Sequence, residues 1–147
     1  MTVEALVDSN LLVYAYDHSE PEKQQRSLDI LRRIVHGGGQ LSTQVLGEFF
    51  RAVTTKLRPP VPVSDAHTQV AALTRAWKVL PVTSLIALEA ARGVRDHRLA
   101  YWDAQLWATA RLNQVGTVLS EDFADGRVIE GVVFRDPFAR AFDPARF

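Results

Sequence analysis

Four acidic residues are the candidates for chemistry in this chain, and each stands at or inside a segment that looks buried: Asp8, Glu48, Asp103 and Asp122. Carboxylates are seldom buried without a partner, because removing an unpaired charge from water is costly. A divalent metal ion would offset these charges, and a set of oxygen ligands suits Mg²⁺ or Mn²⁺. Such an ion can polarise a phosphoryl oxygen, lower the pKa of bound water and orient an in-line attack, which is what phosphodiester hydrolysis requires.

Asp8 and Asp122 each follow a predicted strand. Asp8 closes the apolar run of residues 3–7, and Asp122 comes soon after the apolar segment of residues 117–119. Ligands of an open parallel sheet bind at the carboxyl ends of its strands, so we expect both side chains at that edge. Asp also fills turns and helix caps, so each residue taken alone has an ordinary structural interpretation.

Glu48 and Asp103 lie on predicted helices. Asp103 shares a stripe with Leu106 and Trp107, so its charge tops an apolar helix face. A helix N-cap is the structural alternative for this residue. Glu48 lies in a row with Val45, at the margin of its helix's apolar stripe, where a solvated flank position is the alternative. One sheet edge would nevertheless collect all four acids.

Short apolar runs alternate with amphipathic stretches, which favours an α/β fold with a parallel sheet covered on both faces. The expected strands are residues 3–7, 40–42, 118–119 and 132–134, with a short extended piece at 79–82. The expected longer helices are residues 21–35, 44–57, 64–77, 84–93 and 103–114. Thr43 is the expected cap of the second of these helices. We expect one domain, residues 1–147, with its core in residues 3–138 and a short tail at 139–147.

The composition excludes several other chemistries. Lys and Arg balance Asp and Glu at 17 each, so nucleic acid would have to bind through local patches. The absence of cysteine removes disulfides, thiolate metal sites and a cysteine nucleophile. The four histidines lack zinc-like spacing, and there is neither a Gly-x-Ser-x-Gly elbow nor a phosphate-loop ending. The start of the chain lacks the features of a secretion signal, and no apolar run approaches the ~20 residues of a membrane span, so we expect a cytoplasmic protein.

Ordered pieces of the sequence carry a family resemblance from about Val3 to Phe138. They are residues 7–15 (VDSNLLVYA), 41–49 (LSTQVLGEF), 101–104 (YWDA) and 119–122 (LSED), then Gly126 and residues 136–138 (DPF). Each occurs in its predicted structural context. The chain resembles the PIN-domain ribonucleases and, within them, the VapC-type toxins of bacterial toxin–antitoxin pairs. The resemblance implies a three-layer α/β/α sandwich around a mostly parallel central sheet of about four to five strands.

The resemblance also implies site roles, residue by residue. Asp8, Glu48, Asp103 and Asp122 match the metal-binding and catalytic acids of the family, with Mg²⁺ (or Mn²⁺) as the cofactor. Asp8 and Asp103 are implied as direct ligands. Glu48 and Asp122 would complete the pocket by direct coordination, through water or by activating the nucleophile. Ser120 matches the small hydroxyl residue that often precedes the last acid by two positions.

Asn10 is implied to orient Asp8 through its amide. The chain also departs from the family pattern in places. A further acid is common after the last one in the family, and the offset of Asp125 leaves it outside the predicted site. Ala100 stands where Ser is frequent, and Asp136 stands where Asn usually precedes Pro-Phe. Neither position touches the four acids.

The resulting prediction is a metal-dependent endoribonuclease that hydrolyses RNA phosphodiester bonds and acts as the toxin of a toxin–antitoxin system. The resemblance also implies a homodimer and a small antitoxin protein whose segment covers the acidic cleft. Trp77, Trp102 and Trp107 are expected in the core. The candidates for RNA contact, each with a solvated helix face as the alternative, are Arg51, Lys56, Arg58, Arg92, Arg95, His97 and Arg98.

Two other functions stay open from the sequence. A catalytically silent PIN module would bind RNA or protein without cutting, and the loss of an acid would favour it, but none of the four is lost. A structure-specific DNA nuclease would share the acid geometry. Such enzymes tend to carry extra helical arches, for which a chain of 147 residues has little room.

Overall fold

A computed structural model describes residues 2–147 and contains a central, mostly parallel β-sheet. Its strands run in the order β3-β2-β1-β4-β6-β5. Neighbours from β3 to β6 pair in parallel, whereas β5 pairs with β6 in the antiparallel sense. The strands are β1 (Ala5–Val7), β2 (Gly39–Ser42), β3 (Lys78–Leu80), β4 (Thr117–Leu119), β5 (Val128–Ile129) and β6 (Val132–Arg135).

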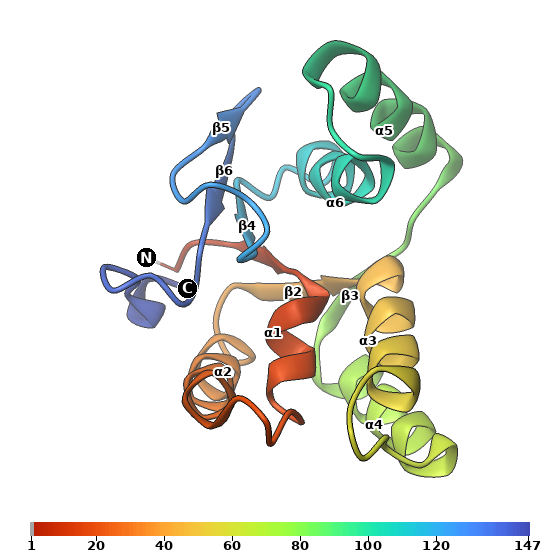
Figure 1. Ribbon diagram of the computed structural model, residues 1–147. Helices are drawn as coiled ribbons and strands as arrows, with labels where there is room; N and C mark the ends of the chain where they lie inside the picture. The colour runs from red at the N-terminus through yellow and green to blue at the C-terminus, as the bar shows by residue number, and fades with distance from the viewer. Residues whose placement is uncertain (1) are drawn as a thin grey trace.

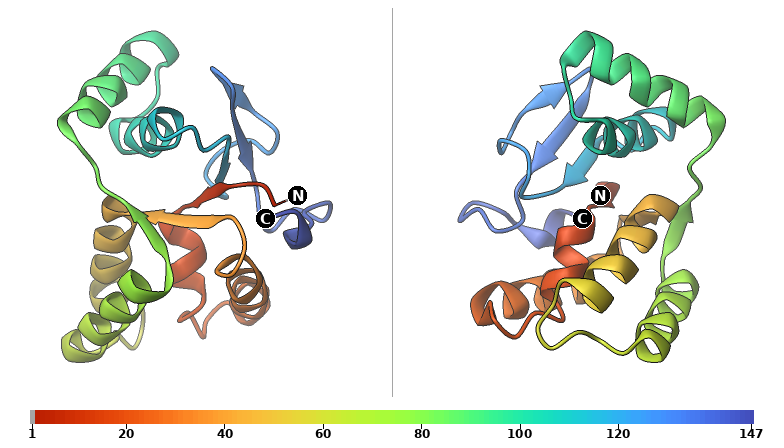
Figure 2. Two further views of the ribbon diagram at one scale, coloured as in Figure 1. Left: turned by 180° about the vertical axis from the view of Figure 1, so that it is seen from behind. Right: turned by 45° about the vertical axis from the view of Figure 1, so that its right-hand side comes forward.

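Helices cover both faces of the sheet and give the expected three layers (Figure 1). Helices α1 to α4 lie on one side, and α5 and α6 pack together on the other, as the two views of Figure 2 also show. The helices are α1 (Ser9–Tyr14), α2 (Pro21–Ile34), α3 (Thr43–Thr55), α4 (Val63–Ala76), α5 (Ser84–His97) and α6 (Tyr101–Leu112), with a 3₁₀ helix at Pro144–Arg146. The predicted α/β fold class is confirmed.

The core lies between the central strands and the helices on either side. All residues of β1 and β4 are buried, because each strand is an uninterrupted apolar or threonine-containing run covered on both faces. On α6, Trp107 is fully buried and its indole N–H donates to the carbonyl of Ile129 at 3.1 Å. Trp77 is also buried, so the expected core positions of these two tryptophans are confirmed.

Three details differ from the sequence prediction. Ser42, rather than Thr43, is the N-cap of α3, because the Ser42 hydroxyl accepts from the backbone N–H of Val45 at 3.2 Å. The hydroxyl of Thr43 instead accepts from the N–H of Val82 at 3.1 Å, which ties α3 to the segment after β3. Within residues 2–147 the sheet has six strands. The extra one, β5, has only two residues and pairs across a tight turn with Gly131 at φ 84°, too short to leave a sequence pattern.

The order of the strands reverses between β1 and β4. From β1 the sheet grows through β2 to β3 on one side, while β4, β6 and β5 lie on the other. Ligands of open α/β sheets bind in the crevice beyond the carboxyl ends of strands at such a switch point. The residues that follow these two strands are Asp8 and Ser120, and the N–H of Asp8 donates to the carbonyl of Leu119 at 2.9 Å. The fold therefore places Asp8 at the expected ligand position.

The end of the described chain packs against the body of the protein. The guanidinium of Arg26 donates to the carbonyls of Pro137 and Phe142, both at 3.2 Å. The N–H of Val3 donates to the carbonyl of Arg146 at 2.8 Å. These partners are far apart in sequence, which explains why residues 139–147 carried no local pattern. Among residues 2–147, no helix is long and apolar enough to cross a membrane.

The close packing of α5 on α6 makes a prediction at Gly93. A Cβ atom on Gly93 would lie 2.8 Å from the buried ring of Trp107, which has no room to move. We expect Gly93→Ala to lower the free energy of unfolding by about 1–2 kcal/mol, because overpacking outweighs the gain in helix propensity. Gly47→Ala on α3 is the matched control, since its Cβ would meet nothing within 4 Å. That variant should be more stable than wild type by about 1 kcal/mol in urea denaturation. A stabilising Gly93→Ala would contradict this packing argument.

Candidate functional site

Asp8 and Ser120 form the buried floor of the candidate site. Asp8 caps α1, where one carboxylate oxygen accepts from the backbone N–H of Ser9 at 2.7 Å. The other oxygen accepts from the hydroxyl of Ser120 at 2.7 Å. The Ser120 hydroxyl in turn accepts from the backbone N–H of Asp122 at 3.1 Å. One serine thus links the ends of β1 and β4 to the acid that follows.

The environment of Asp8 disfavours its negative charge. Only 6% of this residue is exposed. Burial raises the pKa of its carboxyl to about 6, against the lowering effect of the hydrogen bonds from Ser120 and Ser9. The nearby charges of Asp122 and Asp103 are smaller causes of the same rise in pKa. The site therefore holds an acid that a cation would stabilise.

Glu48 and Asp103 reach the same region from two helices. Asp103 lies in the first turn of α6, and Ala100 is the N-cap, so the capping interpretation of Asp103 is wrong. Partial burial raises the pKa of Asp103, and the charge of Asp122 adds to this effect. Glu48 is exposed as a residue, but burial at its carboxyl end raises its pKa, followed by the charges of Asp8, Asp103 and Asp122. The four acids predicted from the sequence therefore share one electrostatic environment.

Asn10 connects to this region differently from the prediction. Its amide nitrogen lies 3.5 Å from the hydroxyl of Ser120 and 3.4 Å from a carboxylate oxygen of Asp122, and it makes no hydrogen bond to Asp8. The Asn10 amide oxygen is buried and has no hydrogen-bond partner in the described part of the chain. We therefore assign Asn10 to positioning Asp122, and its unpartnered oxygen leaves the site one unused buried acceptor.

The four acids fit a divalent cation by their chemistry and by their position in the fold. Within residues 2–147, none of them pairs with a Lys, Arg or His side chain. In the same residues, no group of three or more His, Cys, Asp or Glu side chains is already arranged around one ion position. Mg²⁺ commonly takes one or two protein carboxylates and keeps several waters, so it does not require such a complete set.

Sequence reasoning missed a clamp that holds the turn before Asp122. The carboxylate of Glu121 accepts from the hydroxyl of Tyr14 at 2.5 Å and pairs with the ammonium of Lys23 at 2.8 Å. The Tyr14 ring packs edge-on against Phe138. Lys23 and Glu121 are 98 residues apart in sequence, so no local signal could have paired them. The clamp fixes the backbone that leads into Asp122.

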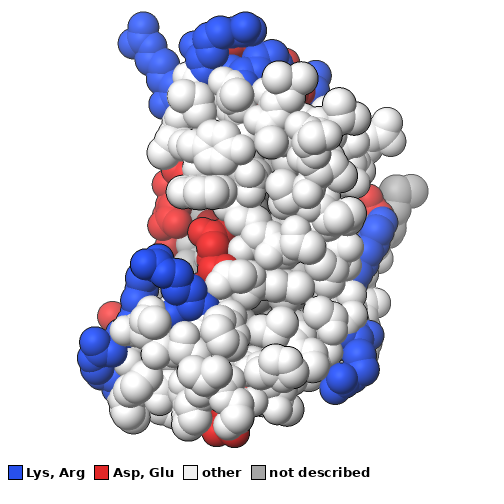
Figure 3. Space-filling view, turned by 90° about the vertical axis from the view of Figure 1, so that its right-hand side faces the viewer, with Lys and Arg blue, Asp and Glu red and all other residues white. Residues whose placement is uncertain are grey.

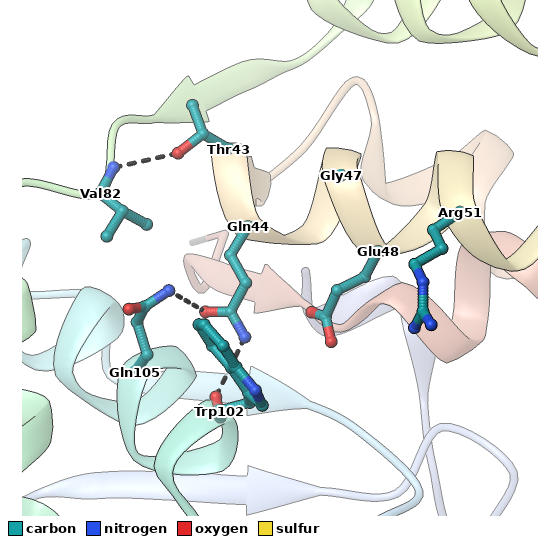
Figure 4. A pocket seen from close by; sticks show the side chains of 8 residues that line it. All are labelled: Thr43, Gln44, Gly47, Glu48, Arg51, Val82, Trp102 and Gln105. Atoms are coloured by element: carbon teal, nitrogen blue, oxygen red, sulfur yellow. Dashed lines mark hydrogen bonds between the residues drawn. The ribbon is translucent and has the colours of Figure 1, made fainter.

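A hollow of about 530 Å³ opens beside Glu48. It lies between the start of α3, the start of α6 and the segment after β3, and Figure 4 shows the side chains around it. Trp102 lines it and is 63% exposed, so the expected core position of Trp102 is wrong. Trp102 lies five positions before Trp107, which places the two side chains about 140° apart around the helix axis, so Trp102 lies off the stripe that buries Trp107.

Several predicted RNA-contacting cations are engaged within the protein. Arg92 pairs with Glu89, Asp96 and Glu130, and His97 lies 2.6 Å from Glu130. This network ties α5 to the β5–β6 turn and to Arg111 of α6, and its arginines are less available to a ligand. Arg95 also pairs with Asp96. Arg51, by contrast, lines the hollow beside Glu48.

The surface around the acids is uneven in charge. Figure 3 shows acidic side chains gathered in a recess, with lysine or arginine side chains directly below them. A broad uncharged surface lies beside this recess. Acidic and basic side chains thus adjoin each other on this face, and Glu48 and Arg51 both line the hollow.

The buried hydrogen bonds of Ser120 predict that replacing this serine lowers the stability of the protein more than replacing Ser9 does. Ser120→Ala removes the donor to Asp8 and the acceptor for the N–H of Asp122, both in a fully buried position. We expect the free energy of unfolding at pH 7, measured in urea, to fall by about 1–3 kcal/mol. Ser9→Ala is the matched control, because the Ser9 hydroxyl lies 3.5 Å from Asp8 and its backbone bond survives the change. Equal losses in the two variants would contradict this role of Ser120.

Comparison with known proteins places this fold in a family. The family model of the PIN domain matches residues 5–124. No curated protein matches the chain in sequence. A toxin–antitoxin complex from Klebsiella pneumoniae is similar in structure, with a TM-score of 0.66 at 15% identity over 92% of this chain and 98% of that one.

Two further structures share the fold. DNA-bound VapBC from Salmonella typhimurium gives a TM-score of 0.65 at 13% identity, over 92% of this chain and 99% of that one. Mycobacterium tuberculosis VapC20, described as a toxin that cleaves the sarcin–ricin loop, gives 0.60 at 16% identity, over 78% and 87%. Because the family model covers most of the chain, the chain belongs to the PIN domain family.

Proposed function

We propose that this PIN-domain protein is a divalent-metal-dependent endoribonuclease of the VapC type, the toxin of a toxin–antitoxin system. The observation that carries the proposal is the cluster of mutually repelling carboxylates at the β1–β4 switch point, none of them paired with a basic side chain within residues 2–147. The fold neighbours support it, because one is a toxin–antitoxin complex, one is DNA-bound VapBC, and one is described as a toxin that cleaves the sarcin–ricin loop.

In this proposal Asp8 and Asp103 are direct ligands and Glu48 and Asp122 complete the site. The bound Mg²⁺ or Mn²⁺ would polarise the phosphoryl oxygen and lower the pKa of a water. Asp8 is held by Ser9 and Ser120, so its carboxylate is oriented in advance. Glu48 and Asp122 are more exposed. They are therefore placed to accept a proton from the attacking water or to orient it.

We place the antitoxin, a separate small protein, on an apolar groove between α1, α2, α3 and α4, in addition to the segment that the resemblance implies over the acidic cleft. This groove has a volume of about 360 Å³ and is lined mainly by Leu12, Leu28, Leu31, Phe49, Leu73 and Trp77. An amphipathic helix buries its apolar face in such a groove. The neighbouring structures include toxin–antitoxin complexes, which is why an antitoxin is the proposed occupant.

We place a homodimer contact on the uncharged surface that includes α5. Leu85 and Leu88 of α5 are both exposed, although large apolar side chains of a soluble domain are usually covered. Figure 3 shows a broad uncharged area on this face of the molecule, with basic side chains along its upper margin. A second copy of the chain would bury such a surface in a twofold-symmetric interface, in which the same patch of each copy meets that of the other.

The test of the proposed activity compares RNA with DNA. Purified protein, free of antitoxin, is incubated with end-labelled single-stranded RNA and with DNA of the same sequence, in Mn²⁺, in Mg²⁺ and in EDTA. We expect internal cuts in the RNA alone, only with a metal ion. Binding of RNA that stays intact in Mn²⁺ would instead identify a silent module, and cutting of branched or flap DNA in preference to RNA would identify a DNA nuclease.

A further inference from the structure

We propose that the exposed indole of Trp102 is a stacking platform for one unpaired nucleobase of the RNA, next to the scissile phosphate. This inference rests on the proposed ribonuclease function and adds a specificity-determining residue to it. It makes the preferred substrate a single-stranded segment whose base can swing out of a helical stack.

The indole of Trp102 is exposed to water at a cost in free energy. Of the three tryptophans, Trp77 and Trp107 are buried, and Trp102 alone is largely exposed. Burying an aromatic ring of this size is worth more than almost any other contact on a protein surface. A ring held at a hollow beside an acid of the site is therefore suited to a flat apolar ligand. A nucleobase is such a ligand, and aromatic side chains stack on bases of any sequence.

Hydrogen bonds within the protein hold Trp102 in place without a ligand. The carbonyl of Trp102 accepts from the amide of Gln44 at 3.0 Å, and the amide of Gln105 donates to Gln44 at 3.0 Å. The hydroxyl of Tyr101 donates to Gln105 at 3.1 Å, and the Tyr101 ring packs edge-on against the indole of Trp102. This chain of bonds joins α3 to α6 behind the indole. It reduces the ordering cost of binding, because the residue is fixed beforehand.

Aromatic, acidic and basic side chains follow one another along the hollow. Figure 4 shows the indole of Trp102 beside Gln44, with the carboxylate of Glu48 and the guanidinium of Arg51 following along the same side of α3. A base on the indole would leave its phosphate near the acids, where the cation is proposed, and Arg51 would meet an adjacent phosphate. The hollow's volume of about 530 Å³ lies within the ~300–1,000 Å³ range of small-ligand sites. The alternation of flat apolar, acidic and basic groups favours a nucleotide over an apolar peptide.

The binding experiment uses tryptophan emission in EDTA, so that no cleavage is needed. The probes are a single-stranded RNA hexamer, the same hexamer with one abasic position, and a blunt RNA duplex. We expect the intact hexamer to quench the emission of the exposed Trp102 and the duplex to leave it unchanged. Because the other two tryptophans are buried, Trp102→Leu should lose this quenching while keeping its thermal unfolding midpoint.

The affinity series measures the platform itself by fluorescence anisotropy of labelled hexamer. Trp102→Leu should weaken binding by roughly 5- to 100-fold, because it removes one stacked base. Trp102→Phe, which keeps an aromatic face, should stay within a few-fold of wild type. The abasic hexamer should bind wild type and Trp102→Leu with affinities that differ less than those of the intact hexamer.

Two results would overturn the proposal. One is unchanged hexamer affinity in Trp102→Leu. The other is a different oligomeric state of Trp102→Leu in sedimentation, with the hexamer affinity per protomer unchanged. That result would make Trp102 a contact between copies of the chain. Failure of the ribonuclease proposal is separate, because it would appear as intact RNA in Mn²⁺ whatever the emission does.

Discussion

Replacing Asp103 with asparagine should lower the rate of RNA cleavage by roughly 1,000-fold, equivalent to about 4 kcal/mol of transition-state stabilisation, while the protein stays folded. Asp103 lies in the first turn of α6, is half-buried, and raises the pKa of Asp8 and Glu48 through its charge. Asparagine has the same shape but one less charge, so it weakens the attraction for a cation without opening a cavity. The measurement is the single-turnover rate with labelled RNA in Mn²⁺.

The matched control for this prediction is Asp125→Asn. Asp125 is exposed, and its carboxylate accepts from the backbone N–H of Asp136 at 3.0 Å. Asp125 is also not among the main causes of the raised pKa values of Asp8, Glu48 and Asp103. We expect Asp125→Asn to cut RNA within a few-fold of wild type. Equal rates for wild type and a folded Asp103→Asn would remove Asp103 from the active site.

The second large effect is on stability: without metal, Asp8→Asn should be more stable than wild type at pH 7. Burial raises the pKa of Asp8 from 3.8 to about 6, so the ionised carboxylate destabilises the folded state. This pKa difference corresponds to a loss of at most about 3 kcal/mol in the free energy of unfolding at pH 7, because the buried site can relax. For a chain of this size that is roughly a 6–12 °C rise in the thermal midpoint.

The pH dependence of this effect has a defined sign. Because the pKa of Asp8 is higher in the folded state, the wild-type protein has its full stability below about pH 4, where Asp8 is protonated. That stability is lost as the pH rises through about 6. The advantage of Asp8→Asn over wild type should therefore be near zero at pH 4 and grow up to pH 7. Saturating Mn²⁺ should reverse it, because a ligand that binds the folded state stabilises it by mass action. A constant difference from pH 4 to pH 7 would contradict the burial argument.

The sequence predicted the positions of the acids better than the surface around them. Asp8 was predictable because a strand end in a parallel sheet has a fixed direction, and Asp103 because its charge tops an apolar helical stripe. Trp102 was expected in the core with the other tryptophans, but it precedes Asp103 by one position and therefore lies off the apolar stripe, where it is exposed. The N-cap of α3 was missed because adjacent Ser42 and Thr43 both suit that role, and only the partner Val82 decides between them.

Contacts between distant segments were beyond the sequence. The clamp of Lys23 and Tyr14 on Glu121, and the bonds of Asn10 to Ser120 and Asp122, join residues about a hundred positions apart. Such pairs depend on the strand order, which places β1 beside β4. Likewise, the ion pairs of Arg92 depend on how α5 packs on α6, so the sequence could not show that its charge is already engaged within the protein.

The most direct test of the central claim is equilibrium Mn²⁺ binding, measured by electron paramagnetic resonance of the free ion. Wild type and Asp125→Asn should bind Mn²⁺ alike, whereas Asp8→Asn and Asp103→Asn should bind at least ~10-fold more weakly. If the folded wild-type protein bound Mn²⁺ no more tightly than the Asp8→Asn and Asp103→Asn variants, the four carboxylates would not form a metal site, and the proposed mechanism would be wrong.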